Sequence, residues 1–304
     1  MSLSRRDFLK ICGTSSVALG FSQMMVPGIV NALEKALSGN PPVIWIQGSG
    51  CSGCSVSILN AVHPTIQEVL LKIISLKVHP TVMAAQGTTV LEVAANISKQ
   101  FKGKFFLVVE GSIPTAANGK YCVVGELGGK SVTMLGWTKD LASKAKAAIA
   151  VGSCASYGGI PAAQPNPTKA QSLIEILNKA DIKTPVINIP GCPPHPDWMV
   201  GTLAYVLLYG IPELDENNRP TLFYGTLVHD HCPYRSYYEE GKFAKYFGDE
   251  GCRYELGCKG PETYCDTWKR KFNNGTNWCV QNAICIGCVQ PKFWDEFSPF
   301  YEAL

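Results

Sequence analysis

The stretch AAIAVGSC, residues 147–154, runs through five apolar positions and then turns to glycine, serine and cysteine. A short run that is apolar at every position is typical of a strand buried on both faces of a parallel sheet. Three further runs share this form: VIWIQ (43–47), FFLVVEG (105–111) and PVINIPG (185–191). The recurrence predicts a parallel sheet in the first two thirds of the chain.

Helix-like segments separate these runs. SVSILNAVHPTIQEVLLKIIS (55–75) follows the first run, and TKAQSLIEILNKA (168–180) is amphipathic, with Thr168 as a plausible N-cap. Strands that alternate with helices predict a doubly wound α/β domain, which we place at residues 42–222. The apolar segment 198–212 is too short to cross a membrane and is predicted to be a buried helix.

The last quarter of the chain has a different character. The polar, proline-bracketed stretch PELDENNRPTL (212–222) predicts a linker. Beyond it, residues 223–304 are rich in Cys, Gly, Pro and aromatic side chains and show little periodicity. Such a segment has few long elements from which to build a core. We therefore expect a smaller, irregular domain that is held together by something other than packing.

Composition narrows the class of protein. The 304-residue chain is 46% hydrophobic and 17% charged, with a formal net charge of +3. These values indicate a globular protein, and the lack of a Lys/Arg stripe argues against nucleic-acid binding. Thirteen cysteines are too sparse for a small disulfide scaffold, so their spacing must decide their role.

The first 32 residues have the layout of an export leader. SRRDFLK (4–10) contains the adjacent Arg5 and Arg6, and an apolar stretch and the small-residue exit VNA follow it. This pattern predicts a cleaved twin-arginine signal at residues 1–32, a route that carries folded proteins to the periplasm. We expect no transmembrane anchor elsewhere in the chain.

Four cysteines stand directly after predicted strands: Cys51 and Cys54 in GSGCSGC, Cys154 in AVGSC, and Cys192 in NIPGC. Because the carboxyl ends of parallel strands line one crevice, these thiols should converge. Converging thiols fit zinc, an iron–sulfur cluster or two disulfides. The wide spacing favours a cluster, since structural zinc usually takes its ligands from two short knuckles. Glu110 also follows a strand, where it could lie near this site or instead have a capping or surface role.

Seven more cysteines fall within 57 residues of the C-terminal region: Cys232, Cys252, Cys258, Cys265, Cys279, Cys285 and Cys288. An odd number does not favour a closed disulfide framework, whereas one added histidine makes eight ligands, enough for two four-ligand sites. Cys12 lies in the leader, and Cys122 is expected to be a buried apolar thiol. His63, His79 and His195 are isolated from the cysteine pairs and are expected to be structural.

Seven motifs occur in an order that resembles one known family, the small subunits of periplasmic nickel–iron hydrogenases. They are GCSGCS, VVEGSIPTA, GSCASYGGIPAA, PGCPPHPDW, HDHCPY, GCKGPETY and CIGC, and the match runs essentially from leader to C-terminus. The resemblance implies a flavodoxin-like domain and a cluster-binding domain with proximal, medial and distal iron–sulfur clusters. It also implies a heterodimer whose large subunit holds the nickel–iron centre, and a multihaem cytochrome c as electron carrier.

Carried over motif by motif, the resemblance assigns ligands to three clusters. The proximal ligands would be Cys51, Cys54, Cys154 and Cys192. The distal ligands would be His229, Cys232, Cys252 and Cys258. The medial ligands would include Cys265, Cys285 and Cys288. His231 fits the distal motif less well, because that motif places histidine three residues before its cysteine. With nickel on the partner, this chain should contain no catalytic residue for hydrogen.

Two positions depart from the common pattern of the family. Most members have proline where this chain has Cys279, and they carry a medial cluster of three irons. A thiolate at this position predicts a four-iron medial cluster, hence three 4Fe–4S clusters, and the pattern resembles the nickel–iron–selenium branch. An oxygen-tolerant branch has two extra cysteines around its proximal cluster. Gly53 and Gly159 stand at those positions, so that protection should be absent.

Two other functions fit part of the sequence. One keeps the clusters and makes the chain the electron-transfer subunit of a different exported oxidoreductase, which nickel in the purified complex would exclude. The other is a secreted binding protein stapled by disulfides. A visible spectrum distinguishes it, because disulfides are colourless and iron–sulfur proteins are brown.

Overall fold

A computed structural model describes residues 41–302 apart from 63, 274 and 277, so the predicted leader lies outside the described residues. A parallel sheet of five strands has the order β2-β1-β3-β7-β9. The strands are β1 (Pro42–Gln47), β2 (Ser75–Val78), β3 (Phe106–Glu110), β7 (Ala147–Val151) and β9 (Val186–Ile189). Renumbered within the sheet, this is the order 2-1-3-4-5 of the flavodoxin-like fold. The predicted doubly wound α/β class is confirmed.

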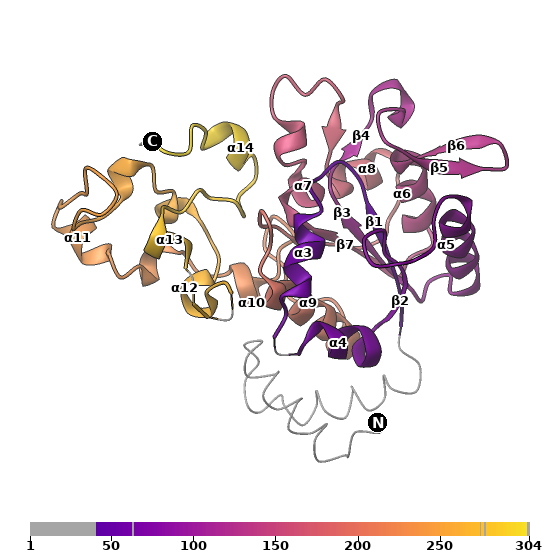
Figure 1. Ribbon diagram of the computed structural model, residues 1–304, viewed down its shortest axis with the longest axis horizontal. Helices are drawn as coiled ribbons and strands as arrows, with labels where there is room; N and C mark the ends of the chain where they lie inside the picture. Colours follow the sequence, from indigo (N-terminus) through magenta and orange to yellow (C-terminus); the bar gives the residue numbers. More distant parts are fainter. Residues whose placement is uncertain (1–40, 63, 274, 277, 303–304) are drawn as a thin grey trace, which may run out of the picture.

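Helices cover both faces of the sheet (Figure 1). They are α3 (Gly53–Leu59), α4 (Ile66–Glu68) and α9 (Pro196–Tyr209) on one face, and α5 (Thr88–Gln100), α6 (Met134–Ala142), α7 (Gly152–Tyr157) and α8 (Leu173–Lys179) on or beside the other. In β1, Val43 and Trp45 pack on the first face, and Ile44 and Ile46 pack on the second. Successive side chains of a strand point to opposite faces, so a sheet covered on both sides needs the continuous apolar runs seen in the sequence.

The predicted helix over residues 55–75 is wrong as a single element. The structure divides it into α3, α4 and a π-helical turn, Val69–Ile73. Pro64 has no N–H to donate within a continuous helix. Thr65 instead starts α4, because its side chain and that of Glu68 form a capping box.

The predicted N-cap at Thr168 is also wrong. The N-cap of α8 is Ser172, which forms a capping box with Glu175. The residues before it are in a short strand, β8 (Ala170–Gln171), that pairs with β4 (Ile113–Pro114). Pairing with a distant segment therefore moves the start of the helix. The remaining strands, β5 (Val123–Leu127) and β6 (Lys130–Thr133), form an antiparallel hairpin.

The predicted linker at 212–222 is an ordered turn. Leu214 and Pro220 form a bridge across it. Arg219 is buried, and its Nε donates to Asp215 Oδ2 at 2.7 Å while its Nη1 donates to the Val289 carbonyl at 3.1 Å. Because its charge is paired and hydrogen-bonded, Arg219 can be buried within a polar stretch.

A smaller C-terminal domain lies beside the sheet domain (Figure 1). Its described helices are all short: α10 (Thr221–Tyr224), α11 (Arg235–Glu239), α12 (Thr267–Arg270), α13 (Cys279–Asn282) and α14 (Phe293–Glu296). Its buried Phe223 and Trp278 belong to the same core as Trp198 of α9. This core therefore continues from the sheet into the smaller domain. Among residues 41–302, apart from 63, 274 and 277, no helix has the length and apolar character needed to cross a membrane.

Candidate metal centres

The first group of thiols lies at the carboxyl edge of the sheet, where the strand order reverses between β1 and β3. It consists of Cys51, Cys54, Cys154 and Cys192, which follow β1, β7 and β9. All four line one cavity, and Glu110 at the end of β3 lines it too. The structure therefore brings together the residues that the strand-end pattern predicts to converge.

Glu110 joins the elements around this cavity. Its buried carboxylate accepts hydrogen bonds from Trp45 Nε1 at 3.0 Å and Gln47 Nε2 at 3.0 Å. It also accepts the backbone N–H groups of Cys54 and Ser55, each at 3.1 Å, at the start of α3. Glu110 thus lies beside the first group and satisfies N–H groups at a helix start, whereas the surface role is excluded by its burial.

Glycines allow the backbone to lie against the thiols of the first group. A Cβ on Gly152 would stand 2.4 Å from Cys54 Sγ, and one on Gly159 would stand 2.6 Å from Cys154 Sγ. Both glycines have positive φ, 86° and 62°, a region that other residues rarely adopt. A thiolate set closely surrounded by backbone fits an iron–sulfur cluster, whose sulfurs accept hydrogen bonds from backbone N–H groups.

The second group of thiols lies in the C-terminal domain: Cys265, Cys279, Cys285 and Cys288. Cys279 is hydrogen-bonded to Cys285 and lies close enough to Cys288 and Cys265 to interact with them electrostatically. The hydrogen bond from Cys279 lowers the pKa of Cys285 to about 7, although burial acts to raise it. The same bond raises the pKa of Cys279, so these two thiols titrate as a pair. The structure thus places Cys279 with the three residues of the medial motif.

The third group lines a separate cavity of the C-terminal domain: His229, Cys232, Cys252 and Cys258. The ring of His231 instead stacks on Trp268, with ring centroids 3.9 Å apart. Burial and the nearby Arg235 lower the pKa of His229. The ring is therefore neutral near pH 7, the state in which imidazole binds metal. Of the two histidines in HDHC, His229 is the one on the cavity.

Hydrogen bonds connect each group to the next. Ser153, which adjoins Cys154 of the first group, donates its hydroxyl to the carbonyl of Cys288 in the second at 2.5 Å. The backbone N–H of Cys285 in the second group donates to Cys258 Sγ in the third at 3.4 Å. The groups therefore follow one another in the order first, second, third. Ser153 was not among the residues predicted from the sequence. The one signal that could have indicated it is its position directly before the cysteine in AVGSC.

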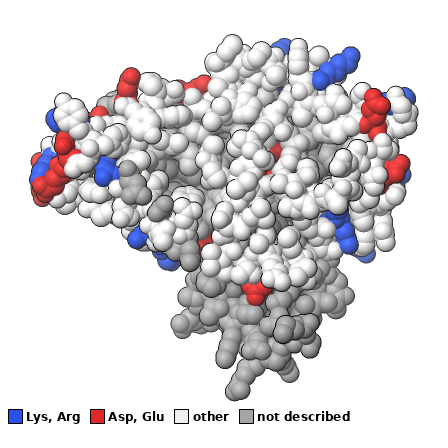
Figure 2. Space-filling model, viewed as in Figure 1, with Lys and Arg blue, Asp and Glu red and all other residues white. Residues whose placement is uncertain are grey.

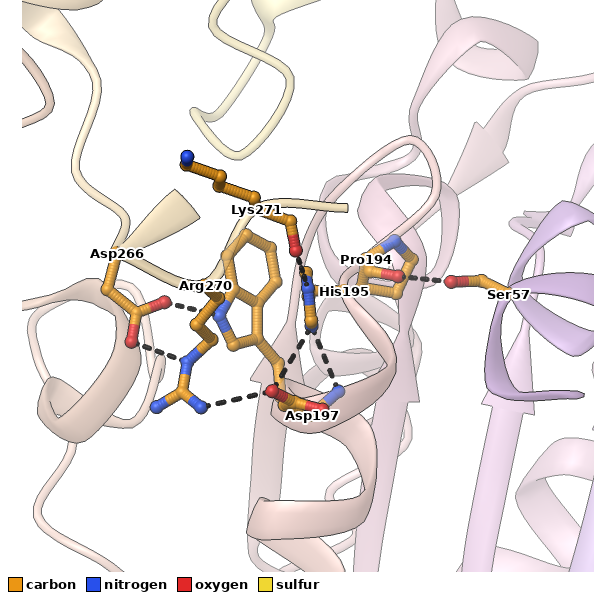
Figure 3. A network of polar contacts seen from close by, with 8 residues as sticks. Ser57, Pro194, His195, Asp197, Asp266, Arg270 and Lys271 are labelled. Carbon is orange, nitrogen blue, oxygen red and sulfur yellow. Dashed lines mark hydrogen bonds and ion pairs between the residues drawn. The ribbon is translucent and has the colours of Figure 1, made fainter. Parts of the chain in front are cut away.

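A polar network also joins the loop after the first group to the segment after Cys265 (Figure 3). His195 contacts the carbonyl of Lys271 through Nε2 at 2.6 Å and accepts the backbone N–H of Asp197 at 3.1 Å. Arg270 pairs with Asp266 at 2.6 Å and with Asp197 at 3.2 Å. Because the side chains of Arg270 and Asp266 are buried, this network ties the sheet domain to the C-terminal domain.

The other candidate residues lie apart from the three groups. Cys122 is half-buried against the core on the α5 side, and burial raises the pKa of its thiol. His79 is buried against Trp45 with ring centroids 4.8 Å apart, and His63 lies outside the described residues. Among described side chains, no three of His, Cys, Asp or Glu lie close enough to hold a single metal ion. The twelve described cysteines are all free thiols.

Known proteins are similar to most of this chain. Two family models match: the NADH ubiquinone oxidoreductase 20 kDa subunit at residues 51–206, and the C-terminal region of the NiFe/NiFeSe hydrogenase small subunit at residues 224–301. The periplasmic nickel–iron–selenium hydrogenase small subunit of Desulfomicrobium baculatum is 53% identical and aligns over 100% of both chains. The periplasmic nickel–iron hydrogenase small subunit 1 of Nitratidesulfovibrio vulgaris is 44% identical over 99% of this chain and 94% of its own.

Solved structures of hydrogenases are also similar to this chain. The nickel–iron–selenium hydrogenase of Desulfovibrio vulgaris Hildenborough matches with a TM-score of 0.85 and 52% identity, over 88% of this chain and 99% of that one. An actinobacterial-type nickel–iron hydrogenase from Ralstonia eutropha matches with a TM-score of 0.80 and 34% identity, over 87% of this chain and 83% of that one.

A flavodoxin-like sheet that gathers cysteines at its carboxyl edge and continues into a cysteine-rich domain defines an iron–sulfur electron-transfer subunit. The chain belongs to the family of small subunits of nickel–iron and nickel–iron–selenium hydrogenases, whose partner is a large subunit. The chain is 53% identical to the nickel–iron–selenium relative from Desulfomicrobium baculatum and 44% identical to the nickel–iron relative from Nitratidesulfovibrio vulgaris. This difference agrees with its resemblance to the selenium branch.

Proposed function

We propose that the chain carries electrons through three 4Fe–4S clusters between the hydrogen-activating large subunit and a multihaem cytochrome c in the periplasm. The observation that supports this best is the series of three four-residue groups, each hydrogen-bonded to the next. When bound, the clusters supply one-electron redox centres, which no side chain of the protein can supply.

The chain's own residues hold the clusters. Four thiolates of the first group bind the proximal cluster, and those of the second group bind the medial one. The third group contributes three thiolates and the neutral ring of His229 to the distal cluster. The contact of Cys279 with Cys285 supports a fourth medial ligand and therefore four irons there. The boundary between the two domains falls at residue 222, within α10.

The large subunit holds the nickel–iron centre, with either cysteine or selenocysteine at nickel, and docks near the first group. Two thiols of that group, Cys51 and Cys192, are exposed. Figure 2 shows charged side chains mainly toward the two ends of the molecule and few in the middle of the view, where Figure 1 places α3. Interface cores are poor in charge, so this face suits a permanent partner.

The third group would hold the cluster at which electrons are exchanged with the carrier. A neutral histidine ligand leaves this cluster with one negative charge fewer than four thiolates would, which favours its reduced state. His229→Cys should therefore lower the distal potential, measured by redox titration. It should also slow turnover with cytochrome c more than it slows hydrogen–deuterium exchange at the partner's centre. Unchanged carrier kinetics would place the exit elsewhere.

The twin-arginine leader exports the assembled heterodimer. The large subunits of the family lack a signal of their own and travel bound to the small subunit. Replacing Arg5 and Arg6 with lysine keeps the positive charge and should retain both subunits in the cytoplasm. A large subunit that still reaches the periplasm would show that it has another route.

Metal analysis of the anaerobically purified complex tests the proposed function. The complex should contain nickel, and the small subunit should contribute about twelve irons with equal acid-labile sulfide. Iron sufficient for one cluster only would contradict the presence of three clusters. A brown complex without nickel would instead favour the electron-transfer subunit of another exported oxidoreductase.

A further inference from the structure

The hydroxyl of Ser153 lies where three ligand-bearing loops meet. Ser153 is buried, with 2% of its surface exposed, and it precedes Cys154 at the start of α7. Its Oγ donates to the Cys288 carbonyl at 2.5 Å and accepts the backbone N–H of Gly191, which precedes Cys192, at 2.9 Å. The backbone N–H of Ser153 donates in return to the Gly191 carbonyl at 3.0 Å. One side chain thus joins two loops of the first group to one loop of the second.

This position requires a side chain that donates and accepts at the same time. A hydroxyl does both, whereas alanine and valine do neither. Ser156, one turn later in α7, is equally buried, but its hydroxyl donates to the Ala150 carbonyl at 3.4 Å, within the same strand–helix unit. Ser153 therefore differs from its neighbour in what it connects, not in burial or in secondary structure.

A second contact runs along the same path. The backbone N–H of Cys192 in the first group donates to the thiol of Cys288 in the second. Ligand loops of the first and second groups therefore touch at two points beside the ligands themselves. The network around His195 in Figure 3 joins the domains farther along the chain, between residues that are not ligands.

We propose that Ser153 is a positioning residue that holds the loops of Cys154 and Cys192 at a fixed separation from Cys288 and so sets the electronic coupling between the first and second clusters. The inference rests on the proposed function and goes further by naming the residue on which that coupling depends. A single electron passes from one cluster to the next. No bond forms or breaks, and the hydroxyl keeps its proton.

The test compares S153T and S153V, whose new side chains are isosteric with each other, in the complete heterodimer purified without oxygen. S156A is the matched control. Thr keeps the hydroxyl and Val lacks it. Iron and sulfide are measured first. The spin–spin interaction of the reduced clusters is then measured by electron paramagnetic resonance, and the rate of electron transfer between clusters is measured after photoreduction.

S153V should show weakened spin–spin interaction and severalfold slower transfer, while S153T and S156A remain like the unmodified protein. Loss of iron in S153V but not in S153T also supports the proposal, because only the hydroxyl differs. Equal coupling, or equal loss of iron, in S153T and S153V would overturn it. An unmodified complex with iron for fewer than three clusters contradicts the proposed function instead, so the two failures are distinguishable.

Discussion

Replacing Cys279 with proline is the sharpest test of the second group, because the backbone is already suited to proline there. Cys279 is the first residue of α13, where proline is favoured since an N–H has no helical partner at that position. The preceding Trp278 has φ −113° and ψ 136°, within the extended region that a residue before proline prefers. The exchange should therefore remove the thiol and leave the chain path unchanged.

The expected magnitudes follow from this geometry. Proline inside a helix costs about 3 kcal/mol or more, but at a compatible position its backbone contribution should stay within about 1 kcal/mol. The iron content should fall from about twelve to about eleven per small subunit, as a four-iron cluster becomes a three-iron one. The medial potential should rise, because a three-iron cluster generally has a higher potential than a four-iron one.

Iron analysis and electron paramagnetic resonance of oxidised samples measure the change. An oxidised three-iron cluster gives a sharp signal, whereas an oxidised four-iron cluster is diamagnetic and gives none. Cys122→Ser is the matched control, because Cys122 is a half-buried thiol outside the three groups and its loss should change neither iron nor signal. The reasoning is refuted if Cys279→Pro keeps all its iron, or if the unmodified protein already shows the three-iron signal at full occupancy.

Three further outcomes are expected. Gly152→Ala should remove the iron of the first group, about four atoms per subunit, because the new Cβ would stand 2.4 Å from Cys54 Sγ. Iron analysis should find all iron retained in Gly103→Ala, which is also at positive φ but has nothing within 4 Å. Arg270→Met should lower the free energy of unfolding by about 3–5 kcal/mol in denaturant titrations, because it leaves the buried Asp266 without its cation. Lys269 is exposed, so Lys269→Met should change the free energy of unfolding by less than about 0.5 kcal/mol. Burial lowers the pKa of His195 below 6.5, so below that pH the unfolded chain binds a proton that the folded chain does not. Stability should therefore fall as pH drops below about 6.5, by at most about 1.4 kcal/mol per pH unit, and the slope should flatten in His195→Gln; an unchanged slope would contradict the assignment.

Local pattern was sufficient to predict the sheet and the convergence of the first group. A strand buried on both faces needs an apolar residue at every position, so Ala147–Val151 could be identified without knowledge of its neighbours. Cysteines that directly follow such strands must lie at one edge of the sheet. The assignment of all twelve candidate ligands depended further on the family resemblance, and their role as ligands stays a prediction.

Features that depend on distant contacts could not be predicted. The start of α8 is displaced because Ala170–Gln171 pairs with Ile113–Pro114. The ring of His231 stacks on Trp268, 37 residues further along the chain. The hydroxyl of Ser153 meets a carbonyl 135 residues further along the chain. No periodicity in the sequence carries information about contacts of this kind.

The shared core has a consequence for the order of biogenesis. Cys258, Cys265 and Cys285 are buried and pack in the same apolar core as the helix α9. A scaffold protein that delivers iron and sulfide cannot reach thiols inside a closed core. Iron and sulfide must therefore reach these thiols before the two domains close on each other. Under the proposed twin-arginine export, the chain would cross the membrane already closed and metal-loaded.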